Sequence, residues 1–257
     1  MTTALITGAS SGIGLELAKV FAKDKINLVL VARSGEKLKQ LATELEKQTG
    51  ITVQILAKDL SNPTTAKEIY DWCKAQNITI DYLVNNAGFG DFGMFVESNW
   101  EKQLQMLNLN ITTLTYLTHL FLPAMVNRKQ GRVLNVASTA AFQPGPTMAV
   151  YYATKAYVLH FSEAIANEVA NSGVTITALC PGATESGFQS AADMHESKLV
   201  KGKKLPSSKE VAEYGYKAMM KGKTVAIHGT MNYIMANTVR FTPRNLVVKI
   251  TRMIQDK

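Results

Sequence analysis

Residues 3–21 read TALITGASSGIGLELAKVF, and this stretch carries the strongest indication of the fold. Residues 4–6 form an apolar run of strand length, and residues 15–21 repeat apolar side chains at helical spacing. Three glycines lie between these two segments: Gly8, Gly12 and Gly14. Glycines allow a sharp turn and a close approach of the backbone to a pyrophosphate at a helix N-terminus. The stretch therefore predicts a strand, a glycine-rich turn and a helix that together bind a dinucleotide.

The alternation of strand and helix continues along the chain. Short runs rich in aliphatic and β-branched residues predict strands at 3–7, 27–32, 51–57, 81–85, 131–137, 174–180 and 223–227. Segments with helical periodicity predict helices at 12–24, 35–48, 63–76, 99–127, 150–171 and 208–221. This alternation indicates an α/β protein with a parallel, doubly wound sheet. No linker or repeat interrupts it, so we expect a single Rossmann-type domain over residues 1–257.

Small and polar residues follow the predicted strands, where ligands of such sheets bind. They are Arg33, Asp59-Leu60, Asn86-Ala87-Gly88, Ser138 and Pro181-Gly182. Tyr151 and Lys155 are four residues apart on the predicted helix 150–171, which places a phenol and an ammonium on one helix face. A neighbouring cation favours the ionised phenol, so Tyr151 could act as a general acid or base. Chance spacing of a packed tyrosine and a solvated lysine is the alternative.

Together these motifs resemble the short-chain dehydrogenase/reductase family, in particular its NADP(H)-preferring type. That family pairs Thr-Gly-x3-Gly-x-Gly near the N-terminus with Tyr-x3-Lys near residue 150, and the strand-end motifs of this chain follow in the family's order. The resemblance covers nearly the whole chain. It implies a Rossmann fold in which a seven-stranded parallel sheet is flanked by helices.

The resemblance also implies where a dinucleotide would bind. The implied residues are Gly8, Ser10, Ser11, Gly12, Ile13, Gly14, Arg33, Asp59, Leu60, Asn86, Ala87, Gly88, Tyr151, Lys155, Pro181, Gly182, Thr184 and Ser186. Arg33 directly follows the second predicted strand. In NAD-binding proteins an acidic residue at this position would bind the adenosine ribose. A guanidinium grips a phosphate through paired hydrogen bonds, so Arg33 with Ser10 predicts a 2′-phosphate site and NADP(H) as cofactor. Arg33 as a solvated loop residue is the alternative, and Asp59 could simply cap a helix near Pro63.

Four residues are implied to carry the catalysis: Asn110, Ser138, Tyr151 and Lys155. By resemblance, Tyr151 gives its proton to the developing alkoxide, and Ser138 donates a hydrogen bond to the substrate oxygen. Lys155 holds the nicotinamide ribose and favours the ionised phenol. Asn110 distorts its helix and anchors a water, with Asn108 as a nearby alternative.

Two segments are expected to depend on the substrate or on a partner. Residues 185–207 correspond to the family's variable substrate lid. Residues 230–257 form an amphipathic C-terminal segment. Its basic and apolar side chains from Arg240 to Lys257 predict a helix, for which we favour packing on the protein or a partner subunit over contact with a membrane surface. Several large side chains suggest an apolar pocket, with ordinary core as the alternative: Phe89, Phe92, Met94, Phe95, Phe142, Phe188 and Met194.

Composition argues against several other classes of protein. The net charge is +8, but no interleaving of basic and aromatic residues supports nucleic-acid binding. The longest apolar runs are strand-length, far below the roughly 20 residues of a spanning helix, so we expect none. Cys73 and Cys180 are far apart in the chain, and neither they nor the histidines have metal-ligand spacing, so we expect no metal site. Met1 directly precedes the first strand, from which we expect no signal peptide and a cytoplasmic protein.

The expected function is the NADPH-dependent reduction of a ketone or aldehyde and the reverse oxidation of an alcohol. An apolar small-molecule substrate is expected, such as a 3-oxoacyl, steroid-like or other lipid-like carbonyl compound. The resemblance implies a homodimer or homotetramer. Two alternatives differ in class: an epimerase or dehydratase of the extended relatives, whose chains are longer and whose glycine spacing differs, and a non-catalytic NADP(H)-binding sensor or scaffold.

Overall fold

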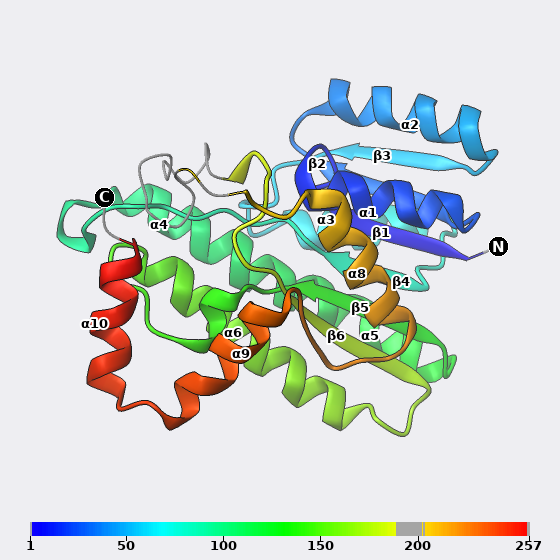
Figure 1. Cartoon of the computed structure of the whole chain (residues 1–257). Coiled ribbons are helices and arrows are strands. Elements are labelled where there is room, and N and C mark those ends of the chain that lie inside the picture. The colour runs from blue at the N-terminus through cyan, green and yellow to red at the C-terminus, as the bar shows by residue number, and fades with distance from the viewer. Residues whose placement is uncertain (1, 189–201, 203, 256–257) are drawn as a thin grey trace.

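Seven parallel strands form one sheet in the computed structural model, which describes residues 2–188, 202 and 204–255 (Figure 1). The strands are β1 (Thr3–Thr7), β2 (Asn27–Ala32), β3 (Val53–Ala57), β4 (Tyr82–Asn85), β5 (Gly131–Val136), β6 (Val174–Cys180) and β7 (Val225–Ile227). Their order is β3-β2-β1-β4-β5-β6-β7. The order reverses at β1, which pairs with both β2 and β4, and ligands bind at such a switch point. The predicted doubly wound Rossmann sheet is confirmed.

Helices cover both faces of the sheet (Figure 1). One face carries α1 (Gly12–Lys23), α2 (Gly35–Thr49) and α8 (Ser208–Met220). The other carries α3 (Thr65–Ala75), α5 (Leu114–Asn127) and α6 (Ala149–Glu168). Successive side chains of a strand point to opposite faces, so Leu5 packs in the second layer and Ile6 in the first. Both faces are buried, which is why β1 is apolar at consecutive positions.

The helix predicted over residues 99–127 is interrupted near its middle. α4 (Trp100–Leu107) continues into a π-helical turn, Asn108–Thr113, before α5 begins. Asn110 lies in this turn, and its side chain bonds both the N–H and the carbonyl of Phe89. A helix commonly gains such a turn where a functional site draws a side chain out of register. The distortion predicted at Asn110 is therefore present.

The same helical run passes a simple test for a membrane span. By length and composition alone, the 28 residues Trp100–Asn127 could cross a bilayer. Core helices of globular proteins pass this test too, and α5 buries Leu117 and Phe121 between the sheet and α3. The expectation of no spanning helix stays a prediction.

The C-terminal segment contains the expected amphipathic basic helix as α10, preceded by a shorter helix. It folds as α9 (Thr230–Thr238), a 3₁₀ turn (Val239–Phe241) and α10 (Arg244–Gln255). Pro243 separates the two helices, because its ring is incompatible with a helix interior and suits a helix start. Of the lid expected at 185–207, residues 189–201 and 203 lie outside the described residues, and Met194 with them.

Candidate active site

A cavity of about 1090 Å³ runs along the carboxyl edge of the sheet. It starts at the glycine-rich turn after β1, passes the ends of β2 to β6 and reaches α9 and α10. Most residues predicted to bind a dinucleotide line it: Gly8, Ser10, Ser11, Gly12, Ile13, Arg33, Asp59, Leu60, Asn86, Ala87, Gly88, Tyr151, Lys155, Pro181, Gly182, Thr184 and Ser186. Ser138 lines it as well. Gly14 and Asn110 are not among its lining residues and support the wall from behind.

The glycine-rich turn depends on residues without a side chain. Gly8 and Gly12 have φ of +67° and +55°, a region that L residues rarely adopt. A Cβ at Gly14 would lie 2.4 Å from the Gly8 carbonyl oxygen and 2.4 Å from Asn86 Nδ2. The Asn86 amide itself donates to the carbonyls of Thr7 and Gly8, which joins the turns after β1 and β4. The three glycines thus serve the tight turn and the close packing of α1 on the sheet.

The first turn of α1 faces the cavity with its amides available. The side chain of its N-cap residue, Ser11, makes no capping hydrogen bond. The free N–H groups at the start of a helix, together with its dipole, attract an anion such as a pyrophosphate. The cavity beside this turn therefore has the chemistry of a phosphate-binding site.

Charge along the cavity is strongly positive. Five described lining residues are cations: Arg33, Lys37, Lys58, Lys155 and Lys204. Asp59 is the one acidic residue among the described lining residues. It accepts hydrogen bonds from the Ser61 N–H and hydroxyl at 2.9 and 2.8 Å, and these bonds, with a contribution from the charge of Arg33, hold its pKa below the ordinary value. Positive charge gathered where β2 and β3 end fits an anionic ligand.

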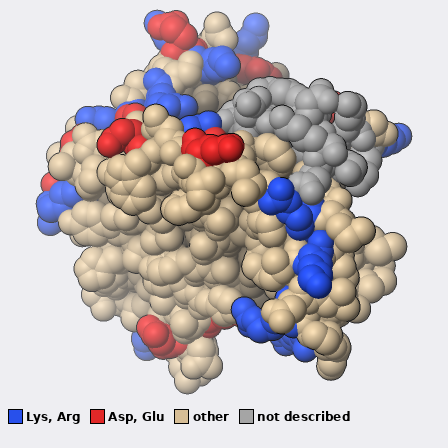
Figure 2. Space-filling view, turned by 90° about the vertical axis from the view of Figure 1, so that its left-hand side faces the viewer, with Lys and Arg blue, Asp and Glu red and all other residues tan. Residues whose placement is uncertain are grey.

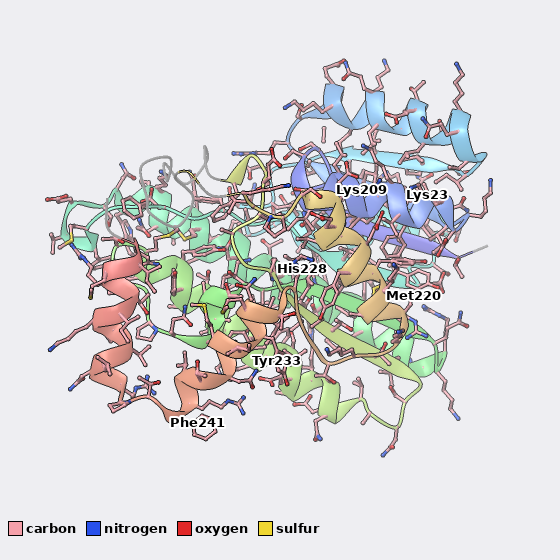
Figure 3. The ribbon with its side chains drawn as sticks, in the orientation of Figure 1. Lys23, Lys209, Met220, His228, Tyr233 and Phe241 are labelled. Atoms are coloured by element: carbon pink, nitrogen blue, oxygen red, sulfur yellow. The ribbon has the colours of Figure 1, made fainter. Side chains whose placement is uncertain are left out.

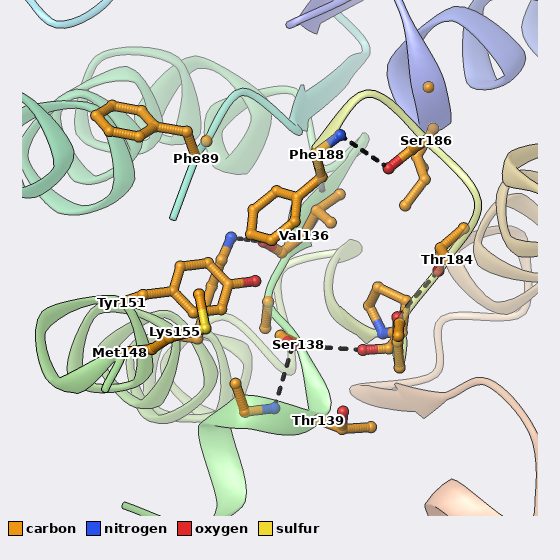
Figure 4. A pocket seen from close by; sticks show the side chains of 18 of the residues that line it. Phe89, Val136, Ser138, Thr139, Met148, Tyr151, Lys155, Thr184, Ser186 and Phe188 are labelled. Atoms are coloured by element: carbon orange, nitrogen blue, oxygen red, sulfur yellow. Dashed lines mark hydrogen bonds between the residues drawn. The ribbon is translucent and has the colours of Figure 1, made fainter. Parts of the chain in front are cut away.

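Tyr151 and Lys155 lie side by side on α6, buried and facing the cavity (Figure 4). The Lys155 ammonium donates to the carbonyl oxygen of Val136 at the end of β5, at 2.8 Å. It lies 5.8 Å from the centre of the Tyr151 ring. The predicted helical spacing therefore does bring the phenol and the cation together beside the end of a strand.

Burial shifts the pKa values of both Tyr151 and Lys155. It raises the pKa of the Tyr151 phenol well above the ordinary value, although a hydrogen bond with Ser138 acts in the opposite direction. It also lowers the pKa of Lys155 to about 8. In both cases burial disfavours the charged form, because the apolar surroundings solvate a charge poorly. Tyr151 therefore holds its proton at neutral pH in this structure, and the expected effect of Lys155 on its ionisation stays a prediction.

Ser138 and Asn110 hold the loops around this pair. Ser138 accepts a hydrogen bond from the Ala140 N–H at 3.1 Å and so caps the short 3₁₀ helix Thr139–Phe142. Asn110 is almost completely buried and also donates to the Thr154 hydroxyl of α6, at 3.0 Å. A Cβ at Gly88 would lie 3.0 Å from Asn110 Oδ1 and 3.4 Å from Lys155 Nζ. All four predicted catalytic residues therefore surround one corner of the cavity.

The far end of the cavity is apolar. Phe89 and Phe188, both anticipated from the sequence, line it, and the Phe188 ring centre lies 5.3 Å from that of Tyr151 (Figure 4). Phe92 packs beside them in the same cluster. The expectation is wrong for the remaining described side chains: Met94 and Phe95 are exposed, and Phe142 packs in the core between α6 and the sheet.

Helix α10 completes this apolar end, which the sequence analysis missed. Val247, Ile250 and Ile254 line the cavity, although they are about a hundred residues from Tyr151 in the chain. Gln255 is fully buried and donates to the hydroxyl of Tyr152, the neighbour of Tyr151. A signal was present in the sequence, because a glutamine on an apolar helix needs a buried partner or solvent. Its partner, however, cannot be read from local spacing.

Comparison with known proteins agrees with this geometry. Residues 2–197 match the family model described as short chain dehydrogenase. The chain belongs to the short-chain dehydrogenase/reductase family. A solved short-chain dehydrogenase from Sphingobium yanoikuyae, in complex with NADPH, is similar over 94% of both chains, with a TM-score of 0.84 and 31% sequence identity.

Two curated relatives are similar over about two thirds of this chain. A 17-beta-hydroxysteroid dehydrogenase type 3 from Mus musculus is 37% identical over 183 residues, which are 69% of this chain and 58% of that protein. A very-long-chain 3-oxoacyl-CoA reductase from Anas platyrhynchos is 33% identical over 184 residues, again 69% and 58%. This short-chain dehydrogenase/reductase therefore matches just over half the length of these relatives.

Proposed function

We propose that this protein is an NADPH-dependent reductase of a bulky, apolar ketone or aldehyde, and that it also oxidises the corresponding alcohol. The observation that carries the proposal is the continuity of one cavity. Its positive end suits an anionic dinucleotide, its apolar end suits a lipid-like carbonyl compound, and a buried proton donor, Tyr151, lies between them.

The residues present fit a nicotinamide dinucleotide with a 2′-phosphate. The start of α1 would hold the pyrophosphate, Arg33 and Lys37 the 2′-phosphate, and Lys155 the nicotinamide ribose. When bound, this cofactor supplies or accepts a hydride. An acidic residue at position 33 would repel the additional phosphate, so the arginine found there supports NADPH over NADH as the cofactor.

The protein's own residues would then handle the proton and the oxygen. Tyr151 is protonated at neutral pH, so it can donate its proton to a carbonyl oxygen that gains negative charge. Ser138 bonds the Tyr151 hydroxyl and would bind the same oxygen. Lys155 is largely charged below its pKa of about 8, and its positive charge would stabilise Tyr151 once the proton has left. Phe89 and Phe188 limit the access of water to the pair.

The apolar end supports a substrate with a large hydrocarbon part. Phe89, Met148, Phe188, Ile250 and Ile254 all line it. The names of the curated relatives refer to a hydroxysteroid and to a very-long-chain 3-oxoacyl-CoA, which are bulky and largely apolar compounds. We extend that substrate class to this chain as part of the proposal.

The reaction class is tested by following NADPH absorbance with a panel of 3-oxoacyl thioesters, steroid ketones and simple aldehydes. We expect turnover with the bulky members and its loss in a Tyr151→Phe variant. NADPH binding without turnover of any carbonyl compound would favour the sensor or scaffold. Turnover that survives in Tyr151→Phe would contradict the assigned proton donor.

Cofactor preference is tested separately with Arg33→Asp. We expect the ratio of kcat/KM with NADPH to that with NADH to fall by on the order of 100-fold, because a carboxylate repels the 2′-phosphate. Lys39→Asp is the matched control: Lys39 is exposed on α2 and is not among the cavity's lining residues, so the same charge change should leave the ratio unaltered. An unchanged ratio in Arg33→Asp would refute the phosphate site.

Location and assembly are part of the same proposal. The described cysteines, Cys73 and Cys180, are buried and unpaired, which suits a reducing cytoplasm. A homodimer or homotetramer follows from the family, whose long helices corresponding to 99–127 and 150–171 pair across a two-fold axis. Sedimentation velocity at several protein concentrations measures the assembly directly, and a monomer at all of them would contradict it.

A further inference from the structure

The C-terminal helices expose an unusual amount of apolar surface. We call this surface the C-terminal ridge; its members are Met231, Tyr233, Ile234, Met235, Phe241, Leu246, Val248, Ile250 and Met253. Phe241 is 88% exposed, Met253 71% and Met231 67%. Figure 3 shows Phe241 at the bend between α9 and α10, where its ring projects away from the protein. Contiguous exposed apolar patches on a globular protein usually mark a binding surface.

Helix α10 packs only part of its apolar stripe against the protein. Its inward face carries the buried Val247, Thr251 and Gln255, two of which are polar. Leu246, Ile250 and Met253 follow one another at helical spacing on an exposed face. Burying an exposed apolar side chain of this size is worth about 1.5–3 kcal/mol, so this orientation leaves much favourable burial unrealised in the protein alone. The exposed face of α10 therefore suits an apolar medium outside the molecule.

The charged residues within α9, the 3₁₀ turn and α10 are all cations. Residues 214–257 contain one acidic residue, Asp256, and eight Lys or Arg residues, against a net charge of +8 for the whole chain. Four of these cations lie on or beside α10: Arg240, Arg244, Lys249 and Arg252. On the side of the molecule where α10 lies, Figure 2 shows Lys and Arg side chains below the grey residues, with no Asp or Glu among them.

We propose that the C-terminal ridge docks on the surface of an anionic phospholipid bilayer. Apolar side chains interleaved with cations are the pattern of helices that lie in a membrane interface. A second copy of the chain would fit less well, because a two-fold contact places each patch against itself and would bring its cations together without acidic partners. A bilayer rich in phosphatidylglycerol or phosphatidylserine satisfies both the apolar side chains and the charge.

Docking would also place the cavity entrance against the lipid. Met231, Met235 and Ile250 belong to the ridge and line the cavity as well. An apolar ketone dissolved in the bilayer would thus enter between α9 and α10 without crossing water. This second part rests on the proposed function, whereas docking itself does not.

Docking is tested by sedimentation of the full chain with phosphatidylglycerol/phosphatidylcholine vesicles and with phosphatidylcholine vesicles alone, at low and high salt. We expect binding to the anionic vesicles at low salt, and weakening by salt. The variant Arg244→Glu/Lys249→Glu should bind at least about 30-fold more weakly, since each surface cation contributes about fivefold. Phe241→Ser/Met253→Ser tests the apolar part and should bind at least tenfold more weakly.

The matched control is Lys39→Glu/Lys47→Glu on α2, which changes the net charge equally at exposed positions. It should bind within about twofold of the wild type, because the attraction is local to the ridge. No sedimentation with anionic vesicles at low salt, or equal losses in the α10 and α2 variants, would overturn the proposal. So would a shift from dimer to monomer in Phe241→Ser/Met253→Ser without vesicle binding by the wild type, because the ridge would then be a subunit interface.

Substrate entry is measured apart from docking. A bulky ketone presented in phosphatidylglycerol-containing vesicles should be reduced faster than in phosphatidylcholine vesicles by the wild type, and this advantage should vanish in Arg244→Glu/Lys249→Glu. Both proteins should reduce a water-soluble aldehyde at equal rates. Vesicle binding without that advantage would overturn the entry route, and vesicle binding without any carbonyl turnover would instead count against the proposed function.

Discussion

The two ends of the cavity are built in different ways. The nucleotide end consists of backbone and of charges that directly follow strands, such as Gly8, Gly12 and Arg33. The substrate end consists of side chains from α6, the loop after β4 and the distant helix α10. Positive-φ turns and the sheet determine the conformation of the first end, whereas the second end depends on packing between remote elements. A family can therefore keep the first end and change its substrate through the second.

We expect the largest effect on activity from a substitution of Tyr151, which lies where the two ends of the cavity meet. Tyr151→Phe removes one hydroxyl from the buried corner and should lower kcat by about 10³-fold, because positioned proton transfer contributes roughly 10²–10⁴-fold. The dissociation constant of NADPH should change by less than about threefold in a fluorescence titration. Tyr152→Phe is the neighbouring control and should reduce kcat only slightly. Equal losses in both variants would assign the effect to packing.

Among substitutions at the nucleotide end, we expect Gly14→Ala to be the most disruptive. Gly14→Ala would place a methyl group against backbone and against Asn86, which cannot move without disturbing the turn. We expect a loss of about 3 kcal/mol in the free energy of unfolding, together with weaker NADPH binding. Urea denaturation measures the first. Gly187→Ala, whose added Cβ would meet nothing within 4 Å, should unfold like the wild type.

Lys155, which lies where the two ends of the cavity meet, should make the stability of the protein depend on pH. Lys155 has a pKa of about 8 in the folded protein and 10.5 as the ordinary value, so the unfolded chain binds more protons between these values. Its contribution to the free energy of unfolding therefore rises with pH from about 8 to 10.5 and is constant below. We expect the free energy of unfolding of the wild type, minus that of Lys155→Met, to increase by about 2 kcal/mol between pH 7 and pH 10.

That difference removes the contribution of buried groups that do not interact with Lys155. Burial raises the pKa of Cys73 and Cys180 to about 12 from 9.0, which lowers stability as the pH rises above about 9. The loss at Cys73 is the same in both proteins and cancels in the difference. Cys180 interacts electrostatically with Lys155, so its share stays in the difference. Urea denaturation of both proteins at each pH supplies the data, and a difference that does not vary with pH would mean that Lys155 is solvated.

A substitution of Gln255 tests whether α10 contributes to substrate selectivity at the substrate end. Gln255→Leu removes the hydrogen bond to Tyr152 and lets α10 shift at the cavity wall. We expect kcat/KM to change about threefold to tenfold for bulky ketones, as the loss of roughly 1 kcal/mol implies, and less than twofold for small aldehydes. Lys249→Ala lies on the same helix but is not among the lining residues, and it should leave soluble substrates unaffected. Uniform losses for all substrates would show that α10 contributes only stability.

The same contrast explains what could be predicted from the sequence. Strands, most helices and the cavity edge were predictable, because periodicity and glycine spacing are local and parallel strands bring their carboxyl ends together. The break at Pro243 and the exposed face of α10 were not, since an amphipathic pattern does not say which face packs inward. Met94 and Phe95 show the same limit: they follow a cavity-lining segment but point to solvent. Burial also raises the pKa of Tyr151, and the spacing to Lys155 cannot reveal that.

The bond from Lys155 to the carbonyl of Val136 has a further consequence for experiments on this corner. Val136 lies two residues before Ser138, so the ammonium that serves the chemistry also ties α6 to the loop that carries the serine. Substitutions of Lys155 and Ser138 are therefore coupled, and their separate losses of transition-state stabilisation should not sum to the loss of the double variant. Assigning each residue its own share of the rate enhancement thus requires a thermodynamic cycle of all four proteins.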